Sequence, residues 1–200
     1  MMLANVSRET AGRLEVYSAL LEKWNRRINL VSRASLVEHP TRHFEDSAQL
    51  YDLVTHPVDH WADLGSGGGF PGLIIAILGQ ERGSPARVTL VESDARKSAF
   101  LNTVIRETAV NATVVTARIE TIPPLDADVL SARALADLST LLGFAARHMR
   151  PDGQAVFPKG RTWQEELAVA QTAWKFSHRV VKSKTETGPV ILHVRGISRV

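Results

Sequence analysis

The stretch Asp63-Leu64-Gly65-Ser66-Gly67-Gly68-Gly69-Phe70-Pro71-Gly72 decides the fold of this 200-residue chain. It follows a short apolar segment, places an acid before a glycine cluster, and leads into the apolar run 73–78. Glycines let backbone N–H groups approach a ligand without a Cβ in the way, and a helix N-terminus attracts polar or anionic groups. The stretch therefore predicts a strand, a cofactor-binding turn and a buried helix.

Hydrophobic periodicity divides the rest of the chain into a helical first part and an alternating second part. Apolar residues at positions 14, 17, 21, 24 and 28 form one stripe of a helix that begins near Ser7, a favoured N-cap residue. From residue 57 onward strand and helix patterns alternate, which is typical of a mostly parallel sheet. The connection 184–188 is too short for a parallel crossover, so the last two strands should form an antiparallel hairpin.

We therefore predict one α/β domain over residues 1–200, with a helical N-terminal extension over 1–56 and a Rossmann-like core over 57–200. The core should be a mostly parallel seven-stranded sheet that ends in the C-terminal antiparallel hairpin. Pro151-Asp152-Gly153 predicts a turn before the fifth strand. The predicted strands are 58–64, 87–92, 112–116, 128–132, 154–158, 178–183 and 190–195, and the predicted helices are 7–27, 41–54, 71–79, 94–108, 136–148 and 162–175.

Composition excludes several classes of chemistry. The chain has no cysteine, which excludes disulfides, thiolate zinc sites and a cysteine nucleophile. The pairs His39/His43 and His56/His60 have helical spacing, but a proline follows the first member of each pair, so we expect no metal site. The N-terminus lacks the apolar core of a signal peptide and no apolar run approaches the length of a membrane span, so we expect a soluble cytoplasmic protein. We also expect it to be a monomer. The net charge of +3 leans mildly toward anionic partners.

The glycine turn raises the question of which cofactor it holds. Gly67-x-Gly69-x-x-Gly72 formally matches the dinucleotide fingerprint, but this frame starts late after the strand and places Pro71 inside the turn. Asp63 stands where a pyrophosphate would bring negative charge. An acid there suits a ligand with a positive centre, such as the sulfonium and α-amino group of S-adenosylmethionine.

Two further acids follow predicted strands and favour an adenosine ligand. Glu92 ends the second strand, where a carboxylate can accept both hydrogen bonds of a ribose diol. Ile119 and Glu120 come just after the third strand, and ligands in open α/β sheets bind off the carboxyl ends of the strands. The Ile119 backbone and the Glu120 carboxylate are thus candidates to meet an adenine edge.

At this point six ordered segments, spanning roughly residues 14–195, resemble the bacterial 16S rRNA (guanine-N7)-methyltransferase family RsmG, also called GidB. The glycine loop with its Phe70-Pro71-Gly72 tail is the most specific of them. Two departures exist: the Ser-Arg-Ala segment usual in the family is spread over 131–134, and Glu92 stands where the family often has Asp. The other segments are Trp24-Asn25 with Asn29-Leu30, Arg42-His43-Phe44-Glu45-Asp46-Ser47, Arg96-Lys97 with Phe100-Leu101, Ser131-Ala132-Arg133-Ala134, and Lys159-Gly160.

The resemblance implies a class I S-adenosylmethionine-dependent methyltransferase fold and a guanosine substrate in a decoding-region loop of small-subunit rRNA. By position it implies cofactor contacts at Gly65, Phe70, Ile119, Glu120 and Arg133, beside the candidates Asp63, Gly67 and Glu92. Such an enzyme needs RNA phosphates held near the cleft, whether in 16S rRNA or in the small subunit. The candidate RNA contacts are Arg26, Arg27, Arg42, His43, Arg96, Lys97, Lys159 and Arg161.

The sequence also indicates which atom of the base is methylated. Methylation of pyrimidine C5 needs a cysteine, and methylation of an exocyclic amine commonly uses an (Asp/Asn/Ser)-Pro-Pro-aromatic loop, whose place is taken here by residues 131–134. Guanine N7 has an in-plane lone pair and no proton to lose, so its methylation requires positioning and no obligatory general base. We name no catalytic residue. An NAD(P)-dependent oxidoreductase and a non-catalytic adenosine- or RNA-binding module remain as alternatives.

Overall fold

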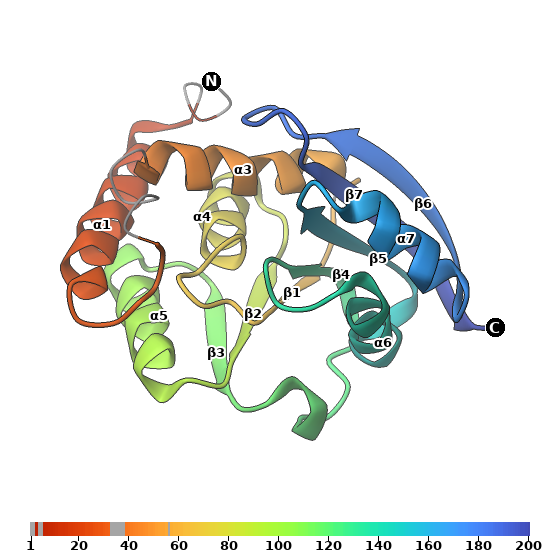
Figure 1. Ribbon diagram of the computed structural model, residues 1–200. Helices are drawn as coiled ribbons and strands as arrows, with labels where there is room; N and C mark the ends of the chain where they lie inside the picture. The colour runs from red at the N-terminus through yellow and green to blue at the C-terminus, as the bar shows by residue number, and fades with distance from the viewer. Residues whose placement is uncertain (1–2, 4–5, 33–38, 56) are drawn as a thin grey trace.

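A seven-stranded sheet forms the centre of the molecule, with helices on both of its faces (Figure 1). The computed structural model describes residues 3, 6–32, 39–55 and 57–200. The strand order is β3-β2-β1-β4-β5-β7-β6; strands β3 to β5 pair in parallel, and β7 pairs antiparallel with both β5 and β6. The predicted mostly parallel sheet with a C-terminal hairpin is confirmed. The strands are β1 (His60–Leu64), β2 (Arg87–Glu92), β3 (Ala112–Thr116), β4 (Ala127–Ala132), β5 (Met149–Lys159), β6 (Trp174–Lys182) and β7 (Val190–Arg199).

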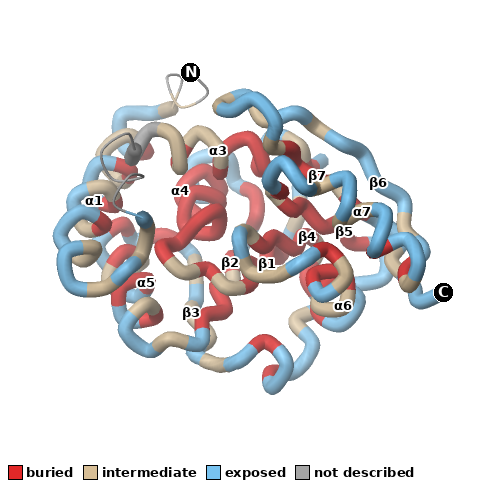
Figure 2. The backbone as a smooth tube through the Cα atoms, viewed as in Figure 1, coloured by how far each residue is buried: buried red, intermediate tan, exposed pale blue. Residues whose placement is uncertain are grey.

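The helices divide into two groups because the two faces of the sheet carry separate apolar clusters. Helices α1, α3, α4 and α5 pack into one cluster, and α6 and α7 pack into the other. Buried residues concentrate in α4 and in the central strands (Figure 2), which places the glycine loop between β1 and α4 above the core. The helices are α1 (Arg8–Asn25), α3 (His39–Leu53), α4 (Gly72–Arg82), α5 (Ala95–Thr108), α6 (Leu138–His148) and α7 (Trp163–Gln171), with a 3₁₀ turn η2 (Ile119–Thr121).

Helix starts follow local sequence signals. The Ser7 hydroxyl accepts a hydrogen bond from the Thr10 N–H, which confirms the predicted N-cap of α1. Asp94 caps α5 in the same way by accepting from the Arg96 and Lys97 N–H groups. Leu14, Tyr17 and Leu21 of the predicted stripe are buried against the core. Within the described residues, every helix is too short or too polar to cross a lipid bilayer.

Residues 151–153 were predicted as a turn before the fifth strand, but they lie inside that strand. Strand β5 begins already at Met149, and its pairing with β4 shifts register between Ala127↔Met149 and Val129↔Gln154. The residues from 150 to 153 are therefore extra residues on one side of the ladder, as in a bulge. The turn-forming residues therefore lie in an irregular part of β5, which pairing with β4 extends to Met149.

The boundary between α7 and β6 also differs from the prediction. The helix expected to reach residue 175 ends at Gln171, and β6 begins at Trp174 rather than at residue 178. Trp174 is buried and pairs with Arg199 of β7, whose guanidinium lies 4.0 Å from the centroid of the indole ring. Pairing with β7 outweighs the helical pattern at this boundary.

Candidate active site

The loop between β1 and α4 is shaped by glycines in left-handed backbone conformations. Gly65, Gly67 and Gly69 have φ values of 67°, 53° and 94°. The N–H groups of Gly65 and Ser66 both donate to the Val91 carbonyl, over 2.9 and 3.1 Å, which ties the loop to the end of β2. These contacts place the loop at the carboxyl edge of the sheet, where ligands bind in this class of fold.

Glu92, the acid at the end of β2, supports this loop directly. One carboxylate oxygen accepts from the Gly67 N–H at 2.9 Å, and the other accepts from the Asp94 N–H at 2.8 Å. A carboxylate offers about four lone-pair sites, so two remain after these bonds. Glu92 can therefore hold the loop and still accept a hydroxyl donor.

Asp63 lies beneath the loop and does not line the cavity above it. Its side chain is fully buried; Oδ1 accepts from the Ser131 hydroxyl at 2.7 Å, and Oδ2 accepts from the Gly72 N–H at 3.2 Å. The Trp61 indole N–H donates to the same Ser131 oxygen at 2.9 Å. Burial raises the pKa of Asp63 from 3.8 to about 6, against the opposing effect of these hydrogen bonds. Both oxygens thus serve to join β1, β4 and α4.

A cavity of about 430 Å³, here called the loop cavity, opens above this network. It brings together the predicted residues Gly65, Gly67, Glu92, Ile119 and Glu120, whereas Asp63, Phe70 and Arg133 do not line it. The Ile119 and Glu120 positions belong to η2, which follows β3. The cavity also includes residues that sequence reasoning did not assign to it: Val91, Ser93, Lys97, Ala117, Arg118, Ala134, Leu135, Ala136, Thr140 and Phe144. Residues 134–136 come just after strand β4, and this position could have identified them as part of the cavity. No feature of the sequence identifies Phe144 as a lining residue.

These residues fit S-adenosylmethionine. A Cβ at Gly65 would come within 2.7 Å of Leu135 Cδ1, so the loop passes close to the opposite wall of the cavity and needs glycine there. Glu92 and Glu120 bring carboxylates to the cavity, while Ile119, Leu135 and Phe144 bring apolar side chains that suit a purine ring. The loop cavity therefore combines the polar and apolar groups that an adenosine cofactor requires.

Phe70 belongs to an aromatic cluster on the α1 and α3 side of the loop. Its ring centroid lies 5.5 Å from that of Tyr17 and 5.0 Å from that of His43, and the Arg133 guanidinium lies 5.0 Å from the Phe70 ring centroid. The Tyr17 hydroxyl donates to the Gly68 carbonyl at 2.5 Å. The Phe70 side chain therefore fixes the loop against the N-terminal helices and leaves only its backbone for cofactor contact.

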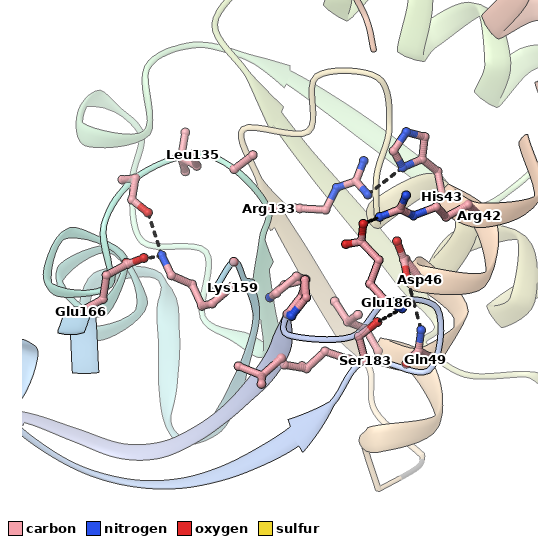
Figure 3. Close-up of a pocket in the computed structure, with 18 of the residues that line it drawn as sticks. Arg42, His43, Asp46, Gln49, Arg133, Leu135, Lys159, Glu166, Ser183 and Glu186 are labelled. Carbon is pink, nitrogen blue, oxygen red and sulfur yellow. Dashed lines mark hydrogen bonds and ion pairs between the residues drawn. The ribbon is translucent and has the colours of Figure 1, made fainter. Parts of the chain in front are cut away.

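A second cavity, of about 880 Å³, lies between α3, the β4–α6 loop and the β6–β7 connection; we call it the α3 cavity (Figure 3). It shares Ala134, Leu135 and Ala136 with the loop cavity, so one short segment forms a common wall. Arg133 points across it toward α3, where its Nη1 lies 3.1 Å from His43 Nδ1. Burial lowers the pKa of Arg133, while Asp46 raises it.

Lys159 was predicted as an RNA contact, but its side chain binds residues that form or support this common wall. Its side chain is only 7% exposed, and Nζ donates to the Ala136 carbonyl at 3.1 Å and pairs with Glu166 Oε2 at 2.5 Å (Figure 3). The same Glu166 oxygen accepts from the Leu138 N–H at 2.9 Å. The ion pair thus anchors the β4–α6 loop to β5 and α7.

We expect Lys159→Met to lower the free energy of unfolding by about 2 kcal/mol, because it leaves Glu166 and the Ala136 carbonyl without their buried partner. Urea unfolding of the variant measures this loss. Lys182→Met, on the exposed β6 strand, serves as the matched control and should change stability by less than about 0.5 kcal/mol. A stable Lys159→Met variant with a weaker salt dependence of RNA binding would instead make Lys159 an RNA contact.

The remaining basic residues of the prediction do not share one cleft. Arg42 and His43 line the α3 cavity, Lys97 lines the loop cavity, and Arg96 is exposed at the start of α5. Arg161 is exposed beside Gly188 of the β6–β7 connection. Arg26 and Arg27 line a separate groove of about 870 Å³ between α1 and α5, which shares no lining residue with the other two cavities. Of the histidine pairs, His56 lies outside the described residues, as does the His39 side chain.

Comparison with known proteins places this geometry in a family. The family model described as rRNA small subunit methyltransferase G matches residues 11–193. The Ribosomal RNA small subunit methyltransferase G of Ruegeria sp. (strain TM1040) is 51% identical over 196 residues, covering 98% of this chain and 95% of that protein. The protein of the same name from Ruegeria pomeroyi is 52% identical, covering 98% and 96% of the two chains.

Solved structures agree in fold at much lower identity. A SAM-dependent methyltransferase from Aquifex aeolicus superposes with a TM-score of 0.61 at 14% identity, covering 90% of this chain and 97% of that one. A mutant of MtNAS in complex with S-adenosylmethionine superposes with a TM-score of 0.63 at 16% identity, covering 93% and 75%. The sheet order, the glycine loop and the full-length match to its relatives agree: the chain belongs to the rRNA small subunit methyltransferase G family.

Proposed function

We propose that the protein transfers a methyl group from S-adenosylmethionine to N7 of a guanosine in a decoding-region loop of 16S rRNA. The observation that carries this proposal is the common wall at 134–136, which separates a cofactor-sized cavity from a larger one by a single short segment. Methyl transfer requires the donor carbon and the acceptor nitrogen to come within about 3–3.5 Å of each other, and the two cavities meet at this segment. Membership of the family supplies the substrate class, since the relatives are named ribosomal RNA small subunit methyltransferase G.

The loop cavity holds the cofactor in this proposal. The backbone at Gly65 and Gly67 would lie against the cofactor, Glu92 would accept hydrogen bonds from its ribose, and Ile119 and Glu120 would lie beside its adenine edge; all five residues line this cavity. S-adenosylmethionine, when bound, supplies an electrophilic methyl group on a sulfonium. Asp63 contributes its negative charge from beneath the loop, where its bonds to Ser131 and Gly72 hold it.

The acceptor guanosine enters the α3 cavity with N7 toward the common wall. N7 carries a free lone pair, so attack needs alignment rather than removal of a proton, and alignment can supply about 7–11 kcal/mol of the barrier. Arg133 is already held by His43 and the Phe70 ring, which suits a positioning role better than proton transfer. The protein's contribution is thus to orient the base and exclude water.

The two alternatives make different predictions. The comparisons do not favour an NAD(P)-dependent oxidoreductase, because the chain matches a methyltransferase family over nearly its full length. A non-catalytic module would bind the cofactor and RNA without transferring a methyl group. We further propose that the protein acts as a cytoplasmic monomer.

A methyl-transfer assay tests the function. Small subunits and naked 16S rRNA from a strain lacking this protein are incubated with labelled S-adenosylmethionine, and the product is mapped by N7-specific chain cleavage. Label at one guanosine N7 in a decoding-region loop is the expected result. Label on a base amine would overturn the N7 assignment, and the absence of transfer to either substrate would support the non-catalytic module.

The α1–α5 groove provides a separate test of RNA binding. Replacing both Arg26 and Arg27 by Ala should weaken RNA binding and reduce the slope of log affinity against log salt by about 1.5, because two phosphate contacts are lost. Cofactor affinity should stay unchanged, since the groove is separate from the loop cavity. Replacement of Arg179 and Lys182, which are exposed on β6 and line none of the three cavities, is the charge-matched control. If both double variants show the same slope of log affinity against log salt, Arg26 and Arg27 do not contact the RNA.

A further inference from the structure

The α3 cavity is lined by four acids; two of them are paired with cations, and a third caps a helix. Glu166 pairs with Lys159, and Glu186 pairs with Arg42. Asp137 caps α6, with one oxygen bonded to the Thr140 N–H and the other to the Thr140 hydroxyl. Two of these three carboxylates are neutralised by a cation, and the third has a donor on each of its oxygens.

Asp46 differs from the other three. Its Oδ1 accepts from the Thr185 hydroxyl and, at 3.4 Å, from the Gln49 amide, and both of these donors are uncharged. Within the part of the chain that the structure describes, no donor is bonded to Oδ2. Asp46 therefore has an acceptor oxygen without a donor at the cavity, among the described residues, and Figure 3 shows it beside Gln49 and Glu186.

The Asp46 carboxylate is also held in place. Gln49 is 3% exposed, and its Oε1 accepts from the Lys184 N–H at 2.8 Å, so its amide group is fixed between α3 and the β6–β7 connection. The Thr185 hydroxyl reaches Asp46 from the same connection. An acceptor oxygen held by two elements is preorganised to recognise a donor, because little side-chain entropy is lost on binding.

We propose that Asp46 selects guanine by accepting hydrogen bonds from its N1–H and exocyclic N2 amine. This inference rests on the proposed function. The N1–N2 edge lies at the far end of the base from N7, so a guanine with N7 toward the wall at 134–136 presents this edge to the α3 side of the cavity. Adenine has an acceptor at N1 and no amine at C2, and a carboxylate there would repel it.

The charge of Asp46 also suits the product. Methylation of N7 turns a neutral base into a cation, and a protein carboxylate that is hydrogen-bonded to this base stabilises the cation. Arg133, Arg42 and Lys159 bring positive charge to this cavity, but the last two are paired with acids. The negative charge of Asp46 already raises the pKa of Arg133, and on a bound guanine it would also offset the positive charge of the methylated base.

Paired substrates test the role of Asp46. Small subunits carrying guanosine or inosine at the target position are compared, because inosine keeps N7 and N1–H but lacks the N2 amine. The wild-type protein should prefer guanosine by about tenfold in kcat/KM, the usual effect of leaving a buried acceptor without its donor. In Asp46→Asn the amide oxygen can still accept from the Thr185 hydroxyl, but the second acceptor oxygen is lost. The variant should therefore methylate guanosine and inosine with about equal kcat/KM, and its affinity for the cofactor should be unchanged.

Two control variants separate recognition from support of the fold. Glu186→Gln removes a neighbouring charge and should keep the full preference for guanosine. Thr185→Val removes one of the donors that hold Asp46 and should reduce this preference only in part. An unchanged preference in Asp46→Asn, or its loss in Thr185→Val to the same degree, would overturn the role of Asp46 and leave the proposed function intact. Absence of N7 transfer by the wild-type protein to guanosine would overturn the proposed function, and this inference with it.

Discussion

Gly65→Val should raise the dissociation constant for S-adenosylmethionine at least about 100-fold, which corresponds to about 2.8 kcal/mol. Gly65 has φ of 67°, a conformation that a β-branched residue adopts only with strain. A Cβ there would also lie 2.7 Å from Leu135 Cδ1 and 3.3 Å from its Cγ. The side chain would occupy the narrow space between the glycine loop and the common wall, where the cofactor has to fit. Isothermal titration calorimetry of the variant measures the change.

Gly83→Val separates the effect of backbone strain from that of lost space. Gly83 has φ of 72°, close to that of Gly65, but no atom lies within 4 Å of the Cβ position there, and Gly83 is the C-cap residue of α4. This variant should lose stability while binding the cofactor with unchanged affinity. Equal affinities for the Gly65 variant and the wild-type protein would show that the loop cavity is not the cofactor site.

Asp63→Asn should change how stability depends on pH. The pKa of Asp63 rises on folding from 3.8 to about 6, so the folded state binds its proton more tightly than the unfolded state does. The stability that this proton provides is complete below pH 3.8 and is lost as the pH rises through about 6, amounting to about 3 kcal/mol. Asparagine does not titrate, so relative to the variant the wild-type protein should lose about this much between about pH 4 and pH 8.

Denaturant unfolding of both proteins across this pH range gives the difference directly, and taking the difference cancels the contributions of the histidines. Ser131→Ala provides a directional control. The Ser131 hydroxyl favours the ionised form of Asp63, so its removal should raise the pKa further and move the loss of stability to higher pH. Parallel stability curves for the wild-type protein and Asp63→Asn would contradict the raised pKa.

These two predictions concern opposite sides of the same loop. Asp63 stabilises the loop from below through Ser131 and Gly72, and Gly65 keeps space free above it. Tyr17 and Phe70 hold its far end against the N-terminal helices. The proposed cofactor site is therefore built by both parts of the chain, the helical extension and the sheet.

Most of the fold could be predicted because its signals are local. Glycine spacing, the caps at Ser7 and Asp94, and the alternation of apolar patterns each depend on a few neighbouring residues. The errors occur where pairing between distant strands prevails. Strand β5 includes residues 150–153 because it pairs with β4 on both sides of them. Strand β6 begins at Trp174 because this residue pairs with Arg199 of β7.

Part of the candidate site could be predicted by the same reasoning. Gly65, Gly67, Glu92, Ile119 and Glu120 follow strands in the sequence, and parallel strands bring their carboxyl ends to one edge. Phe144 and Thr140 reach the same cavity from α6, at positions that the sequence does not distinguish from other helical residues.

The sequence by itself determined the order of helices and strands, the glycine loop and the family, because each is encoded in short stretches whose residues are neighbours in the chain. Only the tertiary structure decided what individual charges do. Lys159 proved to be buried against Glu166, Asp63 to lie under the loop, and Asp46 to face a cavity with a free oxygen. The physical reason is that the energy of a charge depends on its burial and on its partners, and both are set by residues far away in the sequence.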